Sequence, residues 1–492
     1  MSTSVRETSP FAGTDKLTKI AWGTLLVLCG ALFLDALDVS MMGVALPSIK
    51  SSLGMSTSSL QWVVSAYVLG YGGFLLLGGR AADLLGRRRV FLIALGVFIV
   101  ASVLGGFADN GNLLIATRFI KGISAAFTAP AALSIITTSF AEGPARNKAL
   151  SIFTATGATG FSLGLVFGGL LTEIGWRWVF FLPAPVALVT LIAGLRLVPQ
   201  DSKEQRASRR FDVAGAVSMT TAMLLLVFTL VEAPTAGWVS LRTLGSLAGV
   251  VALFVAFVAR ERSTAAPLVR LGILRSSSLV RANLGAMSLF GGWVGFQFIV
   301  TLYLQQLRGW SALDTGLAIF PAGIIVALVS PRMAALVGRF GVTRLVVTGL
   351  ISIGIGYALF LPIGLHSSYA LGMLPTFLLA GIGFALAFGP LNIAGTSGVA
   401  PEEQGLAGGL LNTSFQFGGA LVLAITTAVI NANVGSSGTP QATLNGFHAA
   451  LFVSVGAAVL GILAMTRRSR VAEVVPAFDQ IEESLAEAAE AA

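Results

Sequence analysis

Long apolar stretches, separated by short polar ones, run along almost the entire chain. A helix that crosses the hydrocarbon core of a bilayer needs about 20 consecutive, mostly apolar residues. Fourteen segments meet this requirement: Trp22–Leu46, Gln61–Gly78, Val90–Phe107, Leu113–Phe140, Ala149–Leu171, Trp178–Val198, Val213–Val231, Val239–Val258, Asn283–Tyr303, Thr315–Val329, Leu345–Leu361, Tyr369–Pro390, Leu406–Ile430 and Ala449–Met465. The pattern therefore predicts an all-α integral membrane protein with fourteen transmembrane helices.

The basic residues test this count, because short cytoplasmic loops of membrane proteins are rich in Lys and Arg. With fourteen helices, 25 of the 31 Lys and Arg residues fall on the side that holds both ends of the chain. The opposite side holds four, which are Lys50, Arg177, Arg242 and Arg308. The remaining two, Arg118 and Lys121, lie inside helices. The asymmetry predicts that both termini are cytoplasmic. The polar N-terminal stretch also lacks the apolar region of a signal peptide, so we expect it to stay in the cytoplasm.

Two polar stretches divide the predicted helices into sets of six, two and six. We expect five parts: a cytoplasmic tail (1–20), a first six-helix bundle (21–198), a linker with two additional transmembrane helices (199–282), a second six-helix bundle (283–466) and a cytoplasmic tail (467–492). A faint internal repeat supports two related bundles, since Gly79–Arg87 follows the second helix and the similar stretch Pro331–Gly341 follows the tenth. The second copy lacks the acid of the first.

Composition excludes several classes of protein. Only 11% of the 492 residues are charged and 55% are hydrophobic, whereas about 25% of a soluble protein is charged. The net charge of +9 does not indicate nucleic-acid binding, because the basic residues are spread over short loops. With a single cysteine, Cys29, and two histidines, we expect no intramolecular disulfide, no metal site and no cofactor. No serine nucleophile elbow or glycine-rich phosphate loop indicates an enzyme.

Several motifs resemble those of the major facilitator superfamily, specifically its fourteen-helix drug–proton antiporter branch. GGRAADLLGRRRV (Gly78–Val90) is similar to the signature loop between the second and third helices. LDVSMMGVALPSI (Leu37–Ile49) is similar to the first-helix motif, and RFIKGISAA (Arg118–Ala126) to the fourth-helix motif. GWRWVFFLPAP, FDVAGA and GLAGGLLNTSFQFGGA are further segments of this kind. The resemblance covers almost the whole chain and implies a monomeric transporter of the bacterial-type cytoplasmic membrane, with two bundles around a central cavity.

The signature loop is the candidate for a cytoplasmic gate, formed by Gly79, Arg80, Asp83, Gly86 and Arg87. Opposed charges at the cytoplasmic end of the second helix can bridge neighbouring helix ends, and glycine permits a tight turn. The alternative is simple positive-inside anchoring. We favour anchoring for the three consecutive arginines and the gate for Asp83.

Glycines at spacings of four line one side of the fifth helix, at Gly160, Gly164 and Gly168, with Gly169 beside them. Small residues at this spacing let another helix approach closely. The segment resembles the antiporter motif of the family, except that Leu165 replaces its proline. Tight helix packing accounts for the glycines without any role in antiport.

Four charged residues are predicted to lie within the membrane: Asp35 and Asp38 on the first helix, Arg118 and Lys121 on the fourth. Each pair has a spacing of three, which puts both members on roughly one side of the helix, and the two pairs lie at similar depth. Because a charge in lipid costs about 2.5 kcal/mol or more, these residues must face a cavity or each other. They form either a proton-coupling network or a fixed structural one.

The resemblance adds roles to two of the four, since Asp38 and Arg118 match motif positions of the family. Asp35 is an additional acid, and Lys121 stands where the branch usually has glutamine. The added charges indicate a cargo with polar or ionisable groups, or a pair of substitutions that compensate each other. We predict that Asp38 exchanges the coupling proton, that Arg118 tunes it and that Asp35 assists.

Aromatic and amide side chains on several predicted helices are the candidates for a substrate cavity. Aromatic area with a few hydrogen-bonding groups suits bulky amphipathic molecules. The alternative for each aromatic residue is packing or contact with lipid. The candidates are Gln61, Trp62, Tyr67, Trp293, Gln297, Tyr303, Phe384, Phe388, Asn412, Phe415 and Gln416.

These observations predict a secondary active exporter of hydrophobic or amphipathic compounds, driven by inward proton flow through alternating access. Drugs, antibiotics and natural products are the cargo that the resemblance implies. The alternative is a lipid or glycolipid exporter of the same fold, in which the additional helix pair helps the cargo to reach the bilayer. The expected partners are a small-molecule substrate, protons and the lipid bilayer, without nucleic acid.

Overall fold

The structure is a computed structural model that describes residues 18–140, 144–200, 213–264, 272–273, 276–397, 404–434 and 439–467, with the backbone alone for a few of them. The described residues form helices and no strand. The α-helices are α1 (Lys19–Leu53), α2 (Thr57–Leu85), α3 (Arg87–Gly106), α4 (Gly111–Ser139), α5 (Pro144–Ile174), α6 (Trp178–Phe181), α7 (Pro183–Leu197), α8 (Val213–Ala236), α9 (Leu241–Ser263), α10 (Ser277–Leu302), α11 (Ala312–Val329), α12 (Met333–Phe340), α13 (Val342–Leu359), α14 (Leu374–Thr396), α15 (Gln404–Val434) and α16 (Pro440–Thr466).

Twelve helical segments in the described part are long and apolar enough to cross a membrane. They include α6 with α7 as one segment, and they leave out α2 and α8, which hold the second and seventh predicted spans. The membrane-spanning, all-helical character predicted from the sequence is confirmed. The count of fourteen and the orientation of the termini stay predictions.

Polar residues in the short connections determine where several helices begin and end. The side chain of Ser56 accepts a hydrogen bond from the backbone N–H of Ser59 at the start of α2, and Asn110 accepts one from Leu113 at the start of α4. Such N-caps satisfy backbone donors that have no partner within the helix. Gly54, with φ of 61°, ends α1 in the left-handed conformation that favours glycine.

The sixth and second predicted helices differ in detail from the expectation. Residues 178–197 form two helices, α6 and α7, because Pro183 has no N–H to donate into a continuous helix. The second predicted helix, now α2, continues past its expected end at Gly78 as far as Leu85. Gly86 alone therefore makes the tight turn that was expected at both glycines of the loop. Gly86 has φ of 99°, and Gly341 has φ of 76° at the matching turn between α12 and α13. The internal repeat therefore extends to the turn itself.

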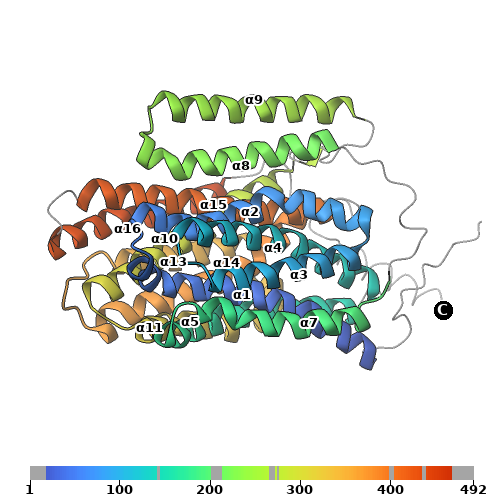
Figure 1. Cartoon of the computed structure of the whole chain (residues 1–492), viewed down its shortest axis with the longest axis horizontal. Coiled ribbons are helices and arrows are strands. Elements are labelled where there is room, and N and C mark those ends of the chain that lie inside the picture. Colours follow the sequence, from blue (N-terminus) through green and yellow to red (C-terminus); the bar gives the residue numbers. More distant parts are fainter. Residues whose placement is uncertain are drawn as a thin grey trace, which may run out of the picture.

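The long helices run side by side along the longest axis of the molecule, and α8 and α9 form a separate layer on one flank (Figure 1). In the first bundle, α1 packs against α5 and α7, and α4 packs against α2 and α3. In the second bundle, α10 packs against α15 and α16, and α14 packs against α11 and α13. The bundles meet along two seams, one between α5 and α11 and the other between α2 and α15.

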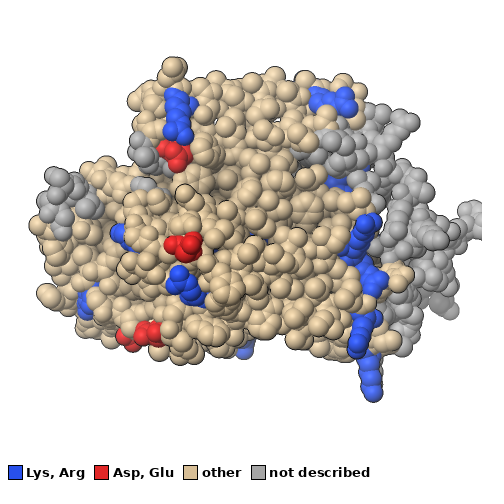
Figure 2. All heavy atoms as spheres, in the orientation of Figure 1, with Lys and Arg blue, Asp and Glu red and all other residues tan. Residues whose placement is uncertain are grey.

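Charged side chains are concentrated at the ends of the helices. We call the end at which α1 begins and α16 ends the terminal end, and the opposite one the distal end. Figure 2 shows Lys and Arg gathered at the terminal end and further charged residues toward the distal end, with a broad stretch between them that is almost free of charge. Large apolar side chains are exposed along the helices, among them Val189, Val255 and Leu460. This distribution fits a molecule surrounded by lipid.

The buried apolar side chains form two large clusters. One runs through both bundles and takes its members from the distal halves of the first-bundle helices, for example Leu46 and Leu171, together with Phe296 and Leu423 of the second bundle. The other cluster, which includes Leu25 and Phe153, belongs to the terminal half of the first bundle alone. Within the described residues, the largest core that the two bundles share therefore involves the distal half of the first bundle, and a smaller cluster joins Tyr67 and Ala125 to Ala420 of α15.

The α8–α9 pair attaches to the rest of the molecule through α8, which contacts both α2 and α15. Trp62 Nε1 of α2 donates a 3.2 Å hydrogen bond to Glu232 Oε1 of α8, and the Trp62 ring lies 5.7 Å from that of Phe228. The other carboxylate oxygen of Glu232 lies 3.7 Å from Arg242 Nη2 of α9. α8 thus covers the seam between α2 and α15.

Candidate functional site

A buried ion network connects α1 to α4 in the middle of the first bundle. The two carboxylate oxygens of Asp38 accept hydrogen bonds from different cations, Oδ1 from Lys121 Nζ and Oδ2 from Arg118 Nη1. All three residues are buried, with Asp38 and Lys121 fully inaccessible and Arg118 1% exposed. The prediction that the first and fourth helices bring their charges to one depth is confirmed for these three residues.

Further contacts compensate the two cations for the loss of water. Arg118 Nε donates a 3.1 Å hydrogen bond to the backbone carbonyl of Val63, and its guanidinium lies 4.6 Å from the centre of the Tyr67 ring. Lys121 Nζ lies 4.6 Å from the centre of the Phe98 ring and 5.2 Å from that of Phe180. Aromatic faces attract cations, and the attraction grows when water is absent. The network is therefore held from α2, α3 and α6 as well as from α1.

Asp35, one turn earlier on α1, differs from Asp38 in its environment. Its Oδ2 atom is buried and has no hydrogen-bond partner among the described residues, while the residue retains 8% of its exposure. An ionised carboxylate without a partner is costly in a site of low dielectric, and a protonated one costs far less. Of the two acids, Asp35 is the one whose protonation requires no ion pair to break.

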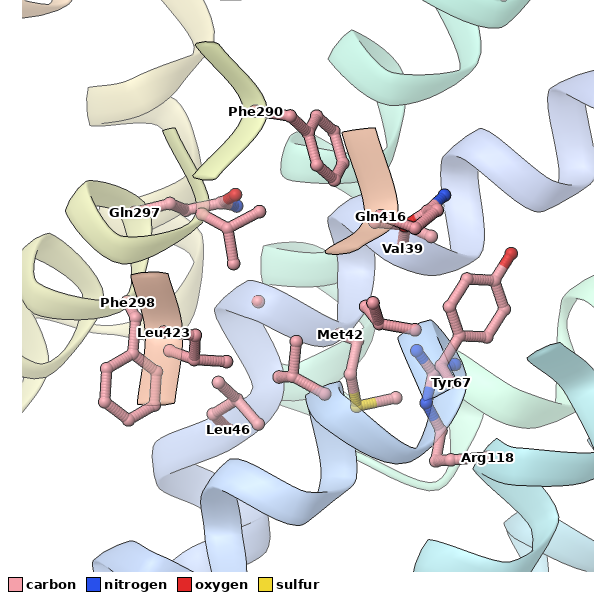
Figure 3. A pocket seen from close by; sticks show the side chains of 14 residues that line it. Val39, Met42, Leu46, Tyr67, Arg118, Phe290, Gln297, Phe298, Gln416 and Leu423 are labelled. Carbon is pink, nitrogen blue, oxygen red and sulfur yellow. The ribbon is translucent and has the colours of Figure 1, made fainter. Parts of the chain in front are cut away.

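A pocket lies between the bundles next to this network (Figure 3). Arg118 contributes its only charge, and the other polar lining residues are Tyr67, Gln297 and Gln416. The remaining lining is apolar: Val39, Met42, Gly43, Leu46, Val64, Val68, Phe290, Val294, Phe298 and Leu423. Its volume of about 40 Å³ is far below the roughly 300–1,000 Å³ of pockets that hold drug-sized ligands. A cargo of that size needs the bundles to move apart.

Four of the predicted cavity aromatics form one cluster beside this pocket. The Trp293 and Phe384 ring centres are 6.0 Å apart, Phe384 stacks on Phe388 at 5.4 Å, and Phe388 lies 5.1 Å from Phe415. Phe290, which lines the pocket, lies 6.2 Å from Phe415 and connects the cluster to it. Together with Tyr67, Gln297 and Gln416 in the lining, seven of the eleven predicted cavity residues therefore gather around one place.

The other four predicted cavity residues have different surroundings. Trp62 contacts α8, as described above, and Tyr303 donates a 2.7 Å hydrogen bond to the carbonyl of Gly364 within the second bundle. Asn412 donates to the carbonyl of Gly408 on its own helix. Gln61 is buried, and its Nε2 atom lacks a partner among the described residues. None of the four lines the pocket.

The glycines of the fifth predicted helix, now α5, lie against two different neighbours. A Cβ atom at Gly160, Gly164 or Gly168 would come within 2.6–2.7 Å of α1 backbone atoms. At Gly169 it would come within 2.6 Å of Leu313 on α11, in the other bundle. The stripe thus permits the close approach of α5 to α1, and Gly169 contributes to the seam between bundles.

The predicted cytoplasmic gate lies at the terminal end of α2. Gly79 and Arg80 are inside that helix, and Gly86 and Arg87 form the turn into α3. The side chain of Asp83 lies outside the described part of the structure, so its role as a gate stays a prediction.

Sequence reasoning missed the polar contacts that cross between bundles at the distal end. Gln305 Nε2 donates a 2.9 Å hydrogen bond to the carbonyl of Val44, and the backbone N–H of Leu313 donates one of 3.3 Å to Glu173 Oε1. The sequence also did not indicate that Gly43 lets Gln297 approach α1 closely, since a Cβ atom there would come within 2.7 Å of Gln297 Nε2. The sequence offered one signal for these contacts, which is that Gln297 and Gln305 place two amide side chains on one helical stretch.

Comparison with known proteins connects this architecture to a family. Residues 28–423 match the Major Facilitator Superfamily. The chain is 37% identical over 470 residues to the cephamycin export protein of Amycolatopsis lactamdurans, a match that covers 94% of this chain and 95% of that protein. It is 37% identical over 463 residues to the puromycin resistance protein of Streptomyces alboniger, covering 90% of each.

A solved structure supports the same fold. The crystal structure of the POT family transporter PepTSo superposes with a TM-score of 0.65 at 16% identity, covering 90% of this chain and 97% of that one. The two-bundle arrangement, the long apolar helices and the extent of these matches lead to one assignment. The chain belongs to the Major Facilitator Superfamily and is a multi-pass transporter of the plasma membrane, not an enzyme.

Proposed function

We propose that this transporter exports hydrophobic or amphipathic compounds in exchange for protons, by alternating access of a central cavity. The observation that carries the proposal is the buried ion network of Asp38, Arg118 and Lys121, with the acid Asp35 one turn away, beside a pocket that both bundles line. Ionisable residues within a membrane are costly and mark ion pathways or relays. The names of the two relatives, which concern export of cephamycin and resistance to puromycin, support antibiotics as the class of cargo.

Asp35 is the acid best suited to take up and release the proton. Protonating Asp38 would leave Arg118 and Lys121 buried without a carboxylate, whereas Asp35 has an oxygen free of partners and a remaining exposure of 8%. The sequence favoured Asp38 for this step, and that assignment stays a prediction. In the scheme proposed here, Asp38 holds α1 against α4 and Asp35 carries the proton.

Alternating access is supported by the uneven packing of the bundles. They share their largest hydrophobic core and the Gln305–Val44 hydrogen bond on the distal side of the first bundle, while the terminal half of the first bundle has a core of its own. Separating the bundles at the distal end breaks these contacts. In the proposed cycle the bundles then approach each other at the terminal end, where the predicted gate at Asp83 stabilises the closed state.

Inside-out vesicles that contain the purified protein test the proposal, with puromycin and a cephamycin as first cargoes. We expect an acidic lumen to drive accumulation of cargo in the wild type and to drive none in Asp35→Asn. Wild-type flux that does not depend on the pH gradient would refute proton coupling and indicate a passive pathway. Movement of lipid between leaflets without movement of either antibiotic would favour the lipid exporter instead.

A further inference from the structure

The central pocket contains hydrogen-bonding groups that nothing in the described protein satisfies. Gln297 of α10 is 8% exposed, and its Nε2 atom has no partner. Tyr67 of α2 is 2% exposed, and its hydroxyl also has none. Both side chains line the pocket. Buried polar groups are nearly always hydrogen-bonded, so an unpaired pair beside a pocket indicates a ligand or water that provides the partner.

The charge of the pocket lining has one sign. Arg118 is the sole charged residue in it, and Asp38, which neutralises Arg118 in part, is fully buried and does not line the pocket. Asp38 also pairs with Lys121, so it neutralises Arg118 only in part. Neither Lys121 nor Asp35 lines the pocket. A positive ligand in this pocket would therefore lose its water and meet a guanidinium instead of a carboxylate.

The polar groups lie on both sides of the space that a cargo would enter. Figure 3 shows Gln297 extending from α10 on one side, with Tyr67 and Arg118 of the first bundle on the other and Gln416 of α15 between them. Among the apolar lining side chains, Met42 lies next to Tyr67 and Arg118, and Leu46 and Leu423 lie toward the side of Gln297. A molecule with an apolar body and acceptor oxygens at its edges matches this arrangement, and it would touch both bundles at once.

We propose that this pocket selects amphipathic cargo without a permanent positive charge by its acceptor oxygens, which Gln297 and Arg118 hold, and that it rejects permanent cations. The inference rests on the proposed function, because it names the cargo class of the same cavity. Gln297 is then a specificity-determining residue. Its amide can donate to a carbonyl oxygen of the cargo, a bond that an aromatic or aliphatic residue at this position cannot make.

Three probes of similar shape separate charge from hydrogen bonding: triphenylphosphine oxide, triphenylmethane and tetraphenylphosphonium. The first is neutral with a strong acceptor oxygen, the second neutral without one, and the third a permanent cation. Binding to the purified full chain is measured by quenching of tryptophan fluorescence and by calorimetry. We expect the oxide to bind about tenfold more tightly than either of the other two, as for one well-formed buried hydrogen bond.

Two variants and a control assign the effect to Gln297. Gln297→Leu should lower affinity for the oxide about tenfold and leave that for triphenylmethane unchanged. Gln297→Glu should reverse the order, so that the phosphonium binds more tightly than the oxide. Gln305→Leu removes a glutamine from the same helical stretch that contacts Val44 and does not line the pocket, and it should keep the wild-type order. Thermal unfolding in detergent verifies that each variant is folded.

Wild-type protein that binds the phosphonium as tightly as the oxide would overturn the inference. So would an equal loss of oxide and triphenylmethane binding in Gln297→Leu, because Gln297 would then contribute shape and not a hydrogen bond. Export of the phosphonium driven by a pH gradient would also overturn it while leaving the proposed function intact. Failure of the proposed function is recognised separately, by flux that does not respond to the gradient.

Discussion

Replacing Asp38 by asparagine removes the carboxylate that contacts both Arg118 and Lys121. These two cations are 1% and 0% exposed, so water cannot reach them in place of the lost charge. Breaking a buried ion pair by removing one partner costs about 3–5 kcal/mol, because the remaining charge is left uncompensated. Here two cations lose the same partner, so we expect Asp38→Asn to lie at the upper part of that range.

Asp35→Asn is the matched control for this experiment, because it makes the same chemical change one turn away on α1. Asp35 makes no ion pair within 4 Å among the described residues, and one of its oxygens lacks any hydrogen-bond partner. Its replacement should change the free energy of unfolding by less than about 1 kcal/mol, the typical net value of one hydrogen bond. We therefore expect the two variants to differ in stability, although the substituted residues lie only one helical turn apart.

The assay compares the resistance of the variants to heat and denaturant in detergent with their transport in vesicles. We expect Asp38→Asn to unfold well before the wild type and Asp35→Asn to unfold with it, while only Asp35→Asn combines normal stability with loss of uphill export. Adding Lys121→Gln to Asp38→Asn should restore part of the stability, because one uncompensated cation is removed. Equal stability of Asp38→Asn and wild type, or uphill export by Asp35→Asn at the wild-type rate, would refute this reasoning.

Three further outcomes can be measured independently. Asp83→Asn should lower the transport rate and leave cargo affinity nearly unchanged; a large loss of affinity at an unchanged rate would place Asp83 at the cargo site. Gly164→Ala should destabilise the protein by about 1–3 kcal/mol, since its Cβ would lie 2.7 Å from a carbonyl of α1. Gly96→Ala, inside α3 with no neighbour within 4 Å, should cause no loss of stability in the same unfolding assay. A reporter fused at Ser202 should be cytoplasmic and one at Gly438 external; external labelling at Ser202 would contradict the fourteen-helix topology.

The sequence alone determined the features that depend on local composition. Apolar segments of sufficient length predicted the membrane spans, because the cost of exposing polar groups to lipid acts on each segment separately. The same cost made Asp35, Asp38, Arg118 and Lys121 conspicuous, since charges are so rare in these segments. The signature motifs then identified the family, which the matches over most of the chain confirm.

The tertiary structure decided which of these residues act together. Asp35 and Asp38 lie on roughly one side of α1, yet the packing of α1 against α4 gives both cations to Asp38 and leaves an oxygen of Asp35 unpaired. Trp62 and Trp293 were equal candidates for the cavity, but α8 covers Trp62 while Trp293 lies in the aromatic cluster beside the pocket. Helical periodicity fixes the direction of a side chain within its own helix. The neighbour that it meets depends on how separate helices are arranged, and no local pattern contains that arrangement.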